Sequence, residues 1–299
     1  MIPICLITGF LGSGKTSLLR HLVASHSQHK LLFLVNDFPP RDIDGARLDL
    51  DQDQVVSVAG GSIFCRCKVT DFIAALRQIR RIDPAPEALI IEASGMADPR
   101  TLPRTLRETM LDQAFIHHQT IAVIDPASFL RLWEAVPAVQ AQVVAASTIL
   151  INKQDCRSPE EREACEELVR HLNPGATIVH TSHAQHPIDP CDVAQPPDLP
   201  AEYAACRDPH FTTAQAAISN PLDWPRLQAA LNDLGPLLYR AKGVVPGSGG
   251  RLQIDYSDSG WDSQPTQRTD DTLALIGTGA AQEALDRLVF QIETGAFAL

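Results

Sequence analysis

The chain lacks the features that would assign it to a membrane or to nucleic acid. No stretch reaches the roughly 20 apolar residues that a membrane-spanning helix needs. Positive charge is not in excess, because 25 Lys and Arg residues face 36 Asp and Glu residues. The resulting formal charge of −11 argues against broad electrostatic capture of nucleic acid or of an anionic membrane. Neither class of partner is therefore expected, and any phosphate binding must be local.

A disulfide framework and a signal peptide are also not expected from the sequence. The seven cysteines are odd in number and show no framework spacing, so we expect free thiols in a reducing compartment. No basic segment precedes the apolar run after Met1, and that run breaks at Gly9. These two observations together predict a cytoplasmic protein. The 299 residues, 44% of them hydrophobic, are enough for one large or two ordinary globular domains.

The strongest motif present is a phosphate-binding loop at residues 9–16, Gly-Phe-Leu-Gly-Ser-Gly-Lys-Thr, between an apolar strand and a helix. Its glycines let backbone N–H groups converge on phosphate oxygens, and the helix N-terminus adds partial positive charge. Lys15 is expected to reach the β- and γ-phosphates, and Thr16 to offer its hydroxyl to Mg²⁺. The alternative is a glycine-rich turn that binds nothing. The expected nucleotide contacts in this loop are Gly9, Gly12, Ser13, Gly14, Lys15, Thr16 and Ser17.

Short apolar runs alternate with helical sequence through the first 180 residues. This alternation predicts an α/β fold with a doubly wound, mostly parallel P-loop sheet. Ligands in such sheets bind at the carboxyl ends of the strands, and the polar motifs all follow apolar runs. The predicted strands are 2–7, 30–35, 55–59, 88–91, 120–124, 148–151 and 177–180, and the predicted helices are 16–24, 69–81 and 159–172.

A change of composition divides the chain. Residues 183–209 hold six prolines and little periodicity, which predicts an interdomain linker. We therefore expect a P-loop GTPase domain over 1–182, the linker over 183–209, and a smaller C-terminal α+β domain over 210–299. The elements predicted in the last are helices at 222–234 and 280–292 and strands at 237–245, 251–256 and 272–276.

The run Asn152-Lys153-Gln154-Asp155 follows a predicted strand, where a base-recognition loop would lie. An aspartate there can accept hydrogen bonds from N1–H and the exocyclic amine of guanine, whereas adenine would leave the carboxylate unpaired. The stem of Lys153 can cover the base, and Asn152 can tie this loop to the phosphate loop. The alternative is a turn that Asp155 caps.

Two further strand ends carry acidic residues. Glu92 and Gly95 fit a switch that senses the γ-phosphate, with the carboxylate near Mg²⁺ and the Gly95 N–H near the terminal phosphate. An ordinary helix cap by Ser94 or Asp98 is the alternative. Asp37 lies after the second strand, where it either binds the metal through water or caps a turn. The expected catalytic residues are Lys15, Thr16, Glu92 and Gly95.

These motifs resemble the CobW-type GTPases, which are related to the nickel chaperones HypB and UreG. The resemblance rests on Thr8–Thr16, Glu92–Pro99, Asn152–Asp155 and, in the tail, Tyr239–Gly243, Trp261 and Leu275–Gly277. It spans nearly the whole chain. It implies hydrolysis of GTP coupled to metal handling, with a client metalloenzyme or its apo-form as partner and a GTP-dependent homodimer.

Two departures from the family pattern stand out. Its switch motif Asn-Glu-Phe-Gly-Glu reads Asn-Asp-Phe-Pro-Pro at residues 36–40, so one acidic residue is shortened and one is lost. Its metal motif Cys-x-Cys-Cys keeps one family cysteine in either register, although Cys65 and Cys67 offer two thiols in what we expect to be extended backbone. Thiolates favour Zn²⁺ or another transition metal. The alternative is two free cysteines in a turn.

Histidines are the remaining candidate ligands. His180, His183 and His186 recur at every third position, which fits either imidazole ligation or a solvated loop. His117 and His118 precede a predicted strand and could either face the sheet end near the cysteines or, like the other three, bind no metal.

The residues together favour a Mg²⁺-dependent GTPase that acts as a metallochaperone or as an assembly factor for a metallo- or corrinoid enzyme. Its expected metal ligands are Thr16, Asp37, Glu92, Cys65 and Cys67. Hydrolysis is expected to be slow, since no glutamine or arginine is evidently poised for water and a partner would complete the site. Two alternatives remain, a P-loop small-molecule kinase and a nucleotide-gated partner-binding module without a metal role.

Overall fold

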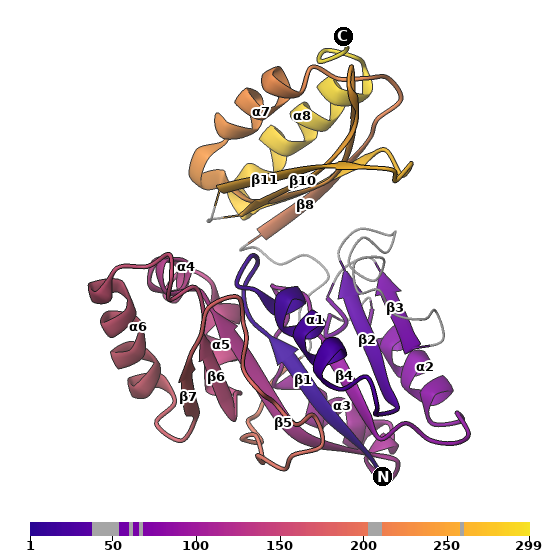
Figure 1. Ribbon diagram of the computed structural model, residues 1–299, viewed down its shortest axis with the longest axis vertical. Helices are drawn as coiled ribbons and strands as arrows, with labels where there is room; N and C mark the ends of the chain where they lie inside the picture. Colours follow the sequence, from indigo (N-terminus) through magenta and orange to yellow (C-terminus); the bar gives the residue numbers. More distant parts are fainter. Residues whose placement is uncertain (38–53, 60–61, 66–67, 203–210, 258–259) are drawn as a thin grey trace. The chain divides into compact units, whose positions relative to one another are not determined.

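The chain forms two compact units, Met1–Cys206 and Arg207–Leu299, and each is described by itself (Figure 1). The structure is a computed structural model, and its description covers residues 1–37, 54–59, 62–65, 68–202, 211–257 and 260–299. The finer predicted division, with a separate linker over 183–209, stays a prediction. Among the described helices, none combines the length and the apolar character that crossing a membrane requires.

The first unit is built on a seven-stranded sheet in the order β3-β2-β4-β1-β5-β6-β7, and neighbouring strands pair in parallel throughout. This confirms the predicted doubly wound α/β sheet. Its strands are β1 (Ile2–Thr8), β2 (Leu31–Asp37), β3 (Val55–Ala59), β4 (Ala88–Glu92), β5 (Phe115–Ile124), β6 (Thr148–Ile151) and β7 (Thr177–His180). Its helices are α1 (Lys15–Ser25), α2 (Val69–Ile79), α3 (Thr101–Glu108), α4 (Pro126–Leu132), α5 (Pro137–Val144) and α6 (Pro159–Leu172).

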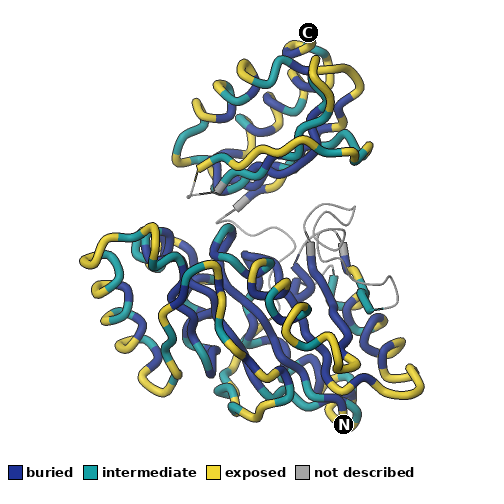
Figure 2. The backbone as a smooth tube through the Cα atoms, in the orientation of Figure 1, coloured by how far each residue is buried: buried dark blue, intermediate teal, exposed yellow. Residues whose placement is uncertain are grey.

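Apolar residues cover both faces of this sheet, which is why its strands read as continuous apolar runs. Along β1, Ile4 and Leu6 face a core that includes Phe72 of α2 and Leu102 of α3. Cys5 and Ile7 point to the other face, where they join Leu18, Leu19 and Leu22 of α1. Figure 2 shows the central strands buried along their length. The sheet is therefore enclosed between two helical layers.

Strand β1 lies where the order of the strands reverses. Its carboxyl end pairs with β4 on one side, Ile7 opposite Glu92, and with β5 on the other, Thr8 opposite Ala122. Such a switch point leaves a crevice at the carboxyl edge of a parallel sheet, and ligands bind there. The segments that follow β1, β4, β5 and β6 therefore converge on one place.

Residues 184–201 run along the first unit and are held to it by hydrogen bonds. Gln119 Nε2 donates to the Asp189 carbonyl at 2.7 Å, and the Ala194 N–H donates to the His118 carbonyl at 3.1 Å. Further on, Arg107 of α3 pairs with Asp198 at 2.7 Å. This segment therefore packs as part of the unit it follows.

The second unit is a five-stranded antiparallel sheet in the order β11-β10-β9-β12-β8, packed against two helices. The α+β prediction is confirmed, but strands β8 and β11 were not expected. The strands are β8 (Phe211–Ala217), β9 (Leu238–Gly247), β10 (Gly250–Ser257), β11 (Gly260–Thr266) and β12 (Thr272–Thr278), and the helices are α7 (Trp224–Asn232) and α8 (Gln282–Glu293). Leu227, Leu285 and Leu288 lie in its core.

Candidate functional site

The loop between β1 and α1 has the backbone that its glycines predict. Gly9, Gly12 and Gly14 have φ values of 141°, 74° and 113°, in the left-handed region. A Cβ atom on Gly9 would come within 2.2 Å of the Val123 carbonyl oxygen, so this position also excludes any side chain. Among the described residues, none caps α1 with its side chain, and the first turn of α1 holds no acid. The helix N-terminus therefore keeps its partial positive charge available to an anion.

Lys15 folds back over this loop. Its ammonium group donates to the Gly9 carbonyl at 2.8 Å and to the Phe10 carbonyl at 3.0 Å, and the residue is buried. These bonds hold the ammonium group of Lys15 against the loop backbone. There it can neutralise the negative charge of phosphate oxygens.

Thr16 and Glu92 come together across the sheet edge. The Thr16 hydroxyl donates to Glu92 Oε1 at 3.1 Å, although the two residues are 76 positions apart. Glu92 ends β4 and is buried. A hydroxyl and a carboxylate at this distance are the oxygen ligands that Mg²⁺ prefers, so these residues fit a Mg²⁺ site.

The segment after Glu92 packs directly on the phosphate loop. The Ala93 N–H donates to the Ile7 carbonyl at 2.9 Å. A Cβ atom on Gly95 would lie 2.7 Å from the backbone nitrogen of Leu11, so only glycine allows this close approach. The buried Gln142 of α5 holds the segment from behind, since its Nε2 donates to the Gly95 carbonyl at 3.0 Å and to the Ala97 carbonyl at 3.2 Å. No sequence signal marked Gln142.

Asn36, at the end of β2, joins this segment to residues 62–65. Its Oδ1 accepts from the N–H of Ile63 at 3.0 Å and from the N–H of Ser94 at 3.3 Å, and its Nδ2 donates to the Val58 carbonyl at 3.0 Å. The segment that carries Cys65 therefore adjoins the segment from Glu92 to Ala97, which contains the predicted switch residues and is called the switch segment below.

The predicted cysteine site is described only in part. Cys65 is buried and follows a turn at residues 63–64, with its N–H donating to the Ser62 carbonyl at 3.0 Å; the expected extended backbone from Cys65 to Cys67 stays a prediction, because residues 66–67 lie outside the described ranges. Its sulfur is disulfide-bonded, contrary to the expected free thiol, whereas Cys5, Cys156, Cys165 and Cys191 are free as predicted. Cys67 and the side chain of Asp37 lie outside the described residues. Their metal roles stay predictions.

The histidines are not brought together. His117 and His118 lie inside β5, which begins at Phe115, so they sit toward the amino end of the strand. The expectation that they face the cysteines is wrong, because Cys65 follows β3 at the opposite, carboxyl edge. His180 contacts Glu166 at 2.8 Å instead. Within the described ranges, no group of three or more His, Cys, Asp or Glu side chains is placed to hold a metal ion.

Asn152 connects the predicted base loop to the phosphate loop. Its Nδ2 donates to the Ser13 carbonyl at 2.9 Å, and its Oδ1 accepts from the Ala184 N–H at 2.8 Å. A Cβ atom on Gly14 would come within 2.4 Å of the same Nδ2, so the phosphate loop and Asn152 fit closely. The loop after β7 joins this arrangement through Ala184, a contribution that the sequence analysis missed.

Lys153 is held by a buried ion cluster. Its ammonium lies 2.8 Å from Asp125 Oδ2, and the guanidinium of Arg157 makes two bonds of 2.7 Å to the same carboxylate. Burial would raise the pKa of Asp125, but the hydrogen bonds and charges of Arg157 and Lys153 outweigh it and keep that pKa below its usual value. Asp125 follows a buried strand, which was a usable signal; nothing in the sequence marked Arg157.

Asp155 is the exposed member of the base loop. Its side chain is 41% exposed, and its Oδ2 lies 3.0 Å from Cys156 Sγ and 3.9 Å from His183 Nε2. The pKa of Asp155 is lowered, first by the hydrogen bond from Cys156. Its carboxylate is therefore charged and accessible, as an acceptor for a base edge must be.

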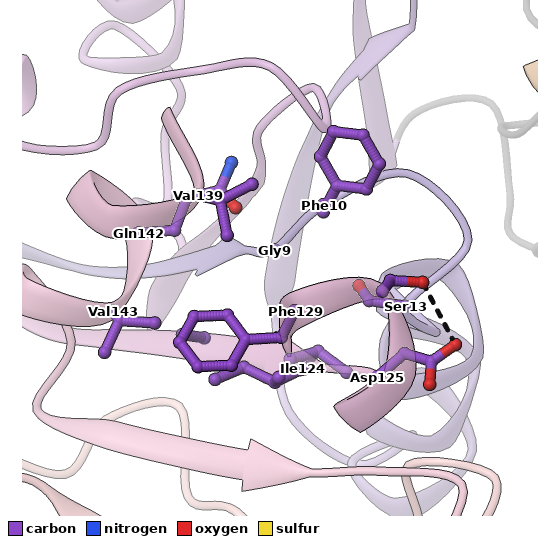
Figure 3. Close-up of a pocket in the computed structure, with 12 residues that line it drawn as sticks. Gly9, Phe10, Ser13, Ile124, Asp125, Phe129, Val139, Gln142 and Val143 are labelled. Carbon is purple, nitrogen blue, oxygen red and sulfur yellow. Dashed lines mark hydrogen bonds between the residues drawn. The ribbon is translucent and has the colours of Figure 1, made fainter. Parts of the chain in front are cut away.

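A small pocket of about 20 Å³ lies behind the phosphate loop, between β5 and the helices α4 and α5 (Figure 3). Its wall includes Phe10 and Ser13 of the loop, Phe129 of α4, and Gln142 of α5. Asp125 lines it as well, so the ion cluster and the switch contact of Gln142 border one cavity.

Comparison with known families covers both units. The family model described as "CobW/HypB/UreG, nucleotide-binding domain" matches residues 3–180. The model described as "Cobalamin synthesis protein cobW C-terminal domain" matches residues 211–292. The first match contains the phosphate loop, the switch segment and the base loop.

Similar individual proteins include the zinc chaperone YjiA of Escherichia coli, 28% identical over 186 residues that make up 61% of this chain and 58% of that protein. Zinc-regulated GTPase metalloprotein activator 1 of Dictyostelium discoideum is 25% identical over 227 residues, 62% of this chain and 47% of that protein. The chain thus spans about half the length of the curated relatives it matches. The crystal structure of Zn(II)-bound YjiA GTPase from E. coli shares the fold, with a TM-score of 0.50 and 19% identity over 97% of this chain and 98% of that one.

Proposed function

The chain belongs to the CobW/HypB/UreG family, and from that premise we propose that it is a Mg²⁺-dependent GTPase that acts as a metallochaperone. The observation that carries the proposal is the bond from Asn152 to the Ser13 carbonyl. Through it, a loop suited to phosphate and a loop suited to guanine form one site. A small-molecule kinase would have no need of the second loop.

Within this proposal the phosphate loop binds the phosphates of GTP, with Lys15 as the neutralising cation. Thr16 and Glu92 hold Mg²⁺, which would neutralise phosphate charge when bound. Gly95 packs against the phosphate loop and offers its N–H to the terminal phosphate. Asp155 recognises the guanine edge. The segment from Glu92 to Ala97 would then respond to the presence of the γ-phosphate.

Binding and hydrolysis test the nucleotide part. Calorimetry on the wild-type chain should give far tighter binding of GTP than of ATP, and Lys15→Ala should abolish both binding and hydrolysis. Asp155→Asn should weaken GTP and improve xanthosine triphosphate, because an amide N–H₂ can meet the additional carbonyl of xanthine. Wild-type hydrolysis in Lys15→Ala would refute the phosphate-loop assignment.

The cargo in this proposal is a zinc-like ion, and the client is a metalloprotein. Relatives named zinc chaperones and metalloprotein activators support both. The two thiols of Cys65 and Cys67 would leave a tetrahedral site half filled, so a facing subunit in a GTP-bound dimer, or Asp37, would complete it. Such an open site suits transfer of the ion to a client better than storage.

Metal titration tests the cargo. The protein must first be reduced, since Cys65 is disulfide-bonded in the structure. Zn²⁺ should bind more tightly with a non-hydrolysable GTP analogue, and Cys65→Ser/Cys67→Ser should abolish this binding. Cys191→Ser, which removes a free thiol elsewhere, is the control. If the double variant binds Zn²⁺ as the wild type does, the cysteine site is wrong.

A further inference from the structure

We propose that Asp125 is a positioning residue for guanine binding: its buried carboxylate fixes the side chain of Lys153 along the base site before nucleotide arrives. The inference rests on the proposed function and adds to it a residue that lies outside all of the nucleotide motifs. It starts from the ion cluster of Asp125, Lys153 and Arg157.

The carboxylate of Asp125 is surrounded by donors. Its side chain is 1% exposed, while those of Lys153 and Arg157 are 17% and 16% exposed. Arg157 donates to both oxygens, and Lys153 and the hydroxyl of Ser128 donate to Oδ2, the last at 3.4 Å. A charged group this deeply buried is stable only with such partners, so the three ionic side chains have one arrangement.

The backbone of Lys153 is fixed as firmly as its ammonium group. Its φ is 60°, a left-handed value that a lysine adopts only when its surroundings impose it. On one side, the Asn152 N–H donates to the Ile124 carbonyl at 2.8 Å; on the other, the Gln154 N–H donates to the Thr181 carbonyl at 3.2 Å. The residue that follows Ile124 is Asp125, so one strand end holds both the main chain and the side chain of this loop.

A lysine held at both ends presents its methylene stem as a fixed apolar surface. In the proposed site that surface would lie against the purine ring. Without Asp125 the side chain would be free to rotate, and nucleotide would have to order it on binding. Ordering one such side chain weakens binding roughly three- to tenfold. GDP and GTP should lose the same factor, because the stem meets the base and not the phosphates.

The effect should depend on the ammonium group of Lys153. Lys153→Met keeps an unbranched apolar stem but removes the group that Asp125 holds. In that background, Asp125→Asn should change nucleotide affinity little. A purely structural role of Asp125, supporting the fold through Arg157, would give the same loss in both backgrounds.

The experiment uses the full chain and measures two affinities for each variant: that of GDP by calorimetry, and that of inorganic tripolyphosphate by competition at fixed salt. Asp125→Asn should weaken GDP roughly three- to tenfold and leave tripolyphosphate unchanged. Ser128→Ala removes only the 3.4 Å bond to the same carboxylate and leaves both ionic partners in place, so it should weaken GDP less than Asp125→Asn does and leave tripolyphosphate unchanged.

If the wild-type chain binds GTP in preference to ATP, three results would overturn the inference. They are wild-type GDP affinity in Asp125→Asn, an equal loss for tripolyphosphate, and a loss of GDP affinity that persists in the Lys153→Met background. A wild-type chain that binds ATP as tightly as GTP would overturn the proposed function first, and this inference with it.

If Asp125→Asn does not fold, Arg157→Lys provides the second variant. It keeps a positive charge but loses the bidentate contact with Asp125. It should weaken GDP binding by a smaller factor and leave tripolyphosphate binding unchanged. An equal loss of affinity for GDP and for tripolyphosphate in Arg157→Lys would overturn the inference.

Discussion

Asn152→Ala should affect both stability and nucleotide binding. The side-chain amide of Asn152 donates to the Ser13 carbonyl at 2.9 Å and accepts from the Ala184 N–H at 2.8 Å. All three residues are buried. Alanine removes both bonds and leaves the two backbone groups without them. Each buried polar group left unsatisfied costs about 1–3 kcal/mol, so we expect a loss of roughly 2–4 kcal/mol after partial relaxation.

The same substitution should weaken GDP roughly tenfold or more, because the phosphate loop and the base loop would no longer be held together before binding. Asn173→Ala is the matched control. Asn173 is also a buried asparagine amide; it donates to the Val143 carbonyl at 2.8 Å and to the Ala146 carbonyl at 2.9 Å, away from the nucleotide motifs. It should lose comparable stability and keep wild-type affinity.

Two measurements separate these effects. Hydrogen exchange of the β1 and β5 amides reports the stability of the first unit alone, which a single unfolding midpoint of a two-unit chain would not. Calorimetry with GDP gives the affinity. Wild-type GDP affinity in Asn152→Ala, or an equal loss of affinity in Asn173→Ala, would refute the role assigned to the Asn152 bonds.

Three further expectations follow from the site and the fold. Gly14→Ala should abolish GDP binding in calorimetry, because its φ is 113° and the new Cβ would lie 2.4 Å from Asn152 Nδ2; retained affinity would contradict the fit. Gln142→Leu removes the donor that holds the Gly95 and Ala97 carbonyls, so it should cost roughly 1–3 kcal/mol and accelerate hydrogen exchange at residues 95–97, and unchanged exchange would count against it. Burial lowers the pKa of His117 to about 4 from 6.5, so the unfolded chain binds more protons between these values and stability falls as the pH drops below 6.5. His117→Gln should remove roughly 1–2 kcal/mol of that fall between pH 7 and pH 5, measured by hydrogen exchange of the β1 and β5 amides, and an equal pH dependence would argue against it.

The sheet of the first unit was predictable because its strands are buried on both faces. Burial on both sides produces apolar runs such as Ala88–Ile91. Such a run identifies a strand even when the neighbouring strands are not known. Strand β5 was predicted five residues short, since His117, His118 and Gln119 interrupt its apolar run. His118 and Gln119 find partners in residues 189–194, which sequence alone does not place beside them.

The second unit was harder to predict. Strand β11 is an edge strand with mostly exposed residues and a proline at 265, so it lacks the apolar pattern. Strand β8 is also an edge strand and reads Phe-Thr-Thr-Ala-Gln-Ala-Ala, with few large apolar side chains. Edge strands need less burial, and their signal in sequence is correspondingly weak.

In the candidate site, the motif residues were predictable because their function constrains their spacing, as between Gly9 and Lys15. Asp125 and Arg157 are 32 positions apart, and Gln142 is 47 positions from Gly95. These pairs follow no spacing rule, since they depend on how α4, α5 and α6 pack. The residues proposed to bind ligand directly were therefore visible in sequence, whereas Gln142 and Arg157, which support the site from other elements, were not.

The order of strands also has a consequence for synthesis of the chain. Ser13 lies near the beginning, but its bond to Asn152 spans 139 positions, and Asn152 in turn waits for Ala184. Contacts of such long range form late, after the loops between them have closed. A chain emerging from the ribosome would thus carry its phosphate-loop sequence long before it could use it. Under the proposed function, nucleotide binding would begin only once residue 184 is in place, so GTP would stabilise chains whose first unit can close and not shorter ones.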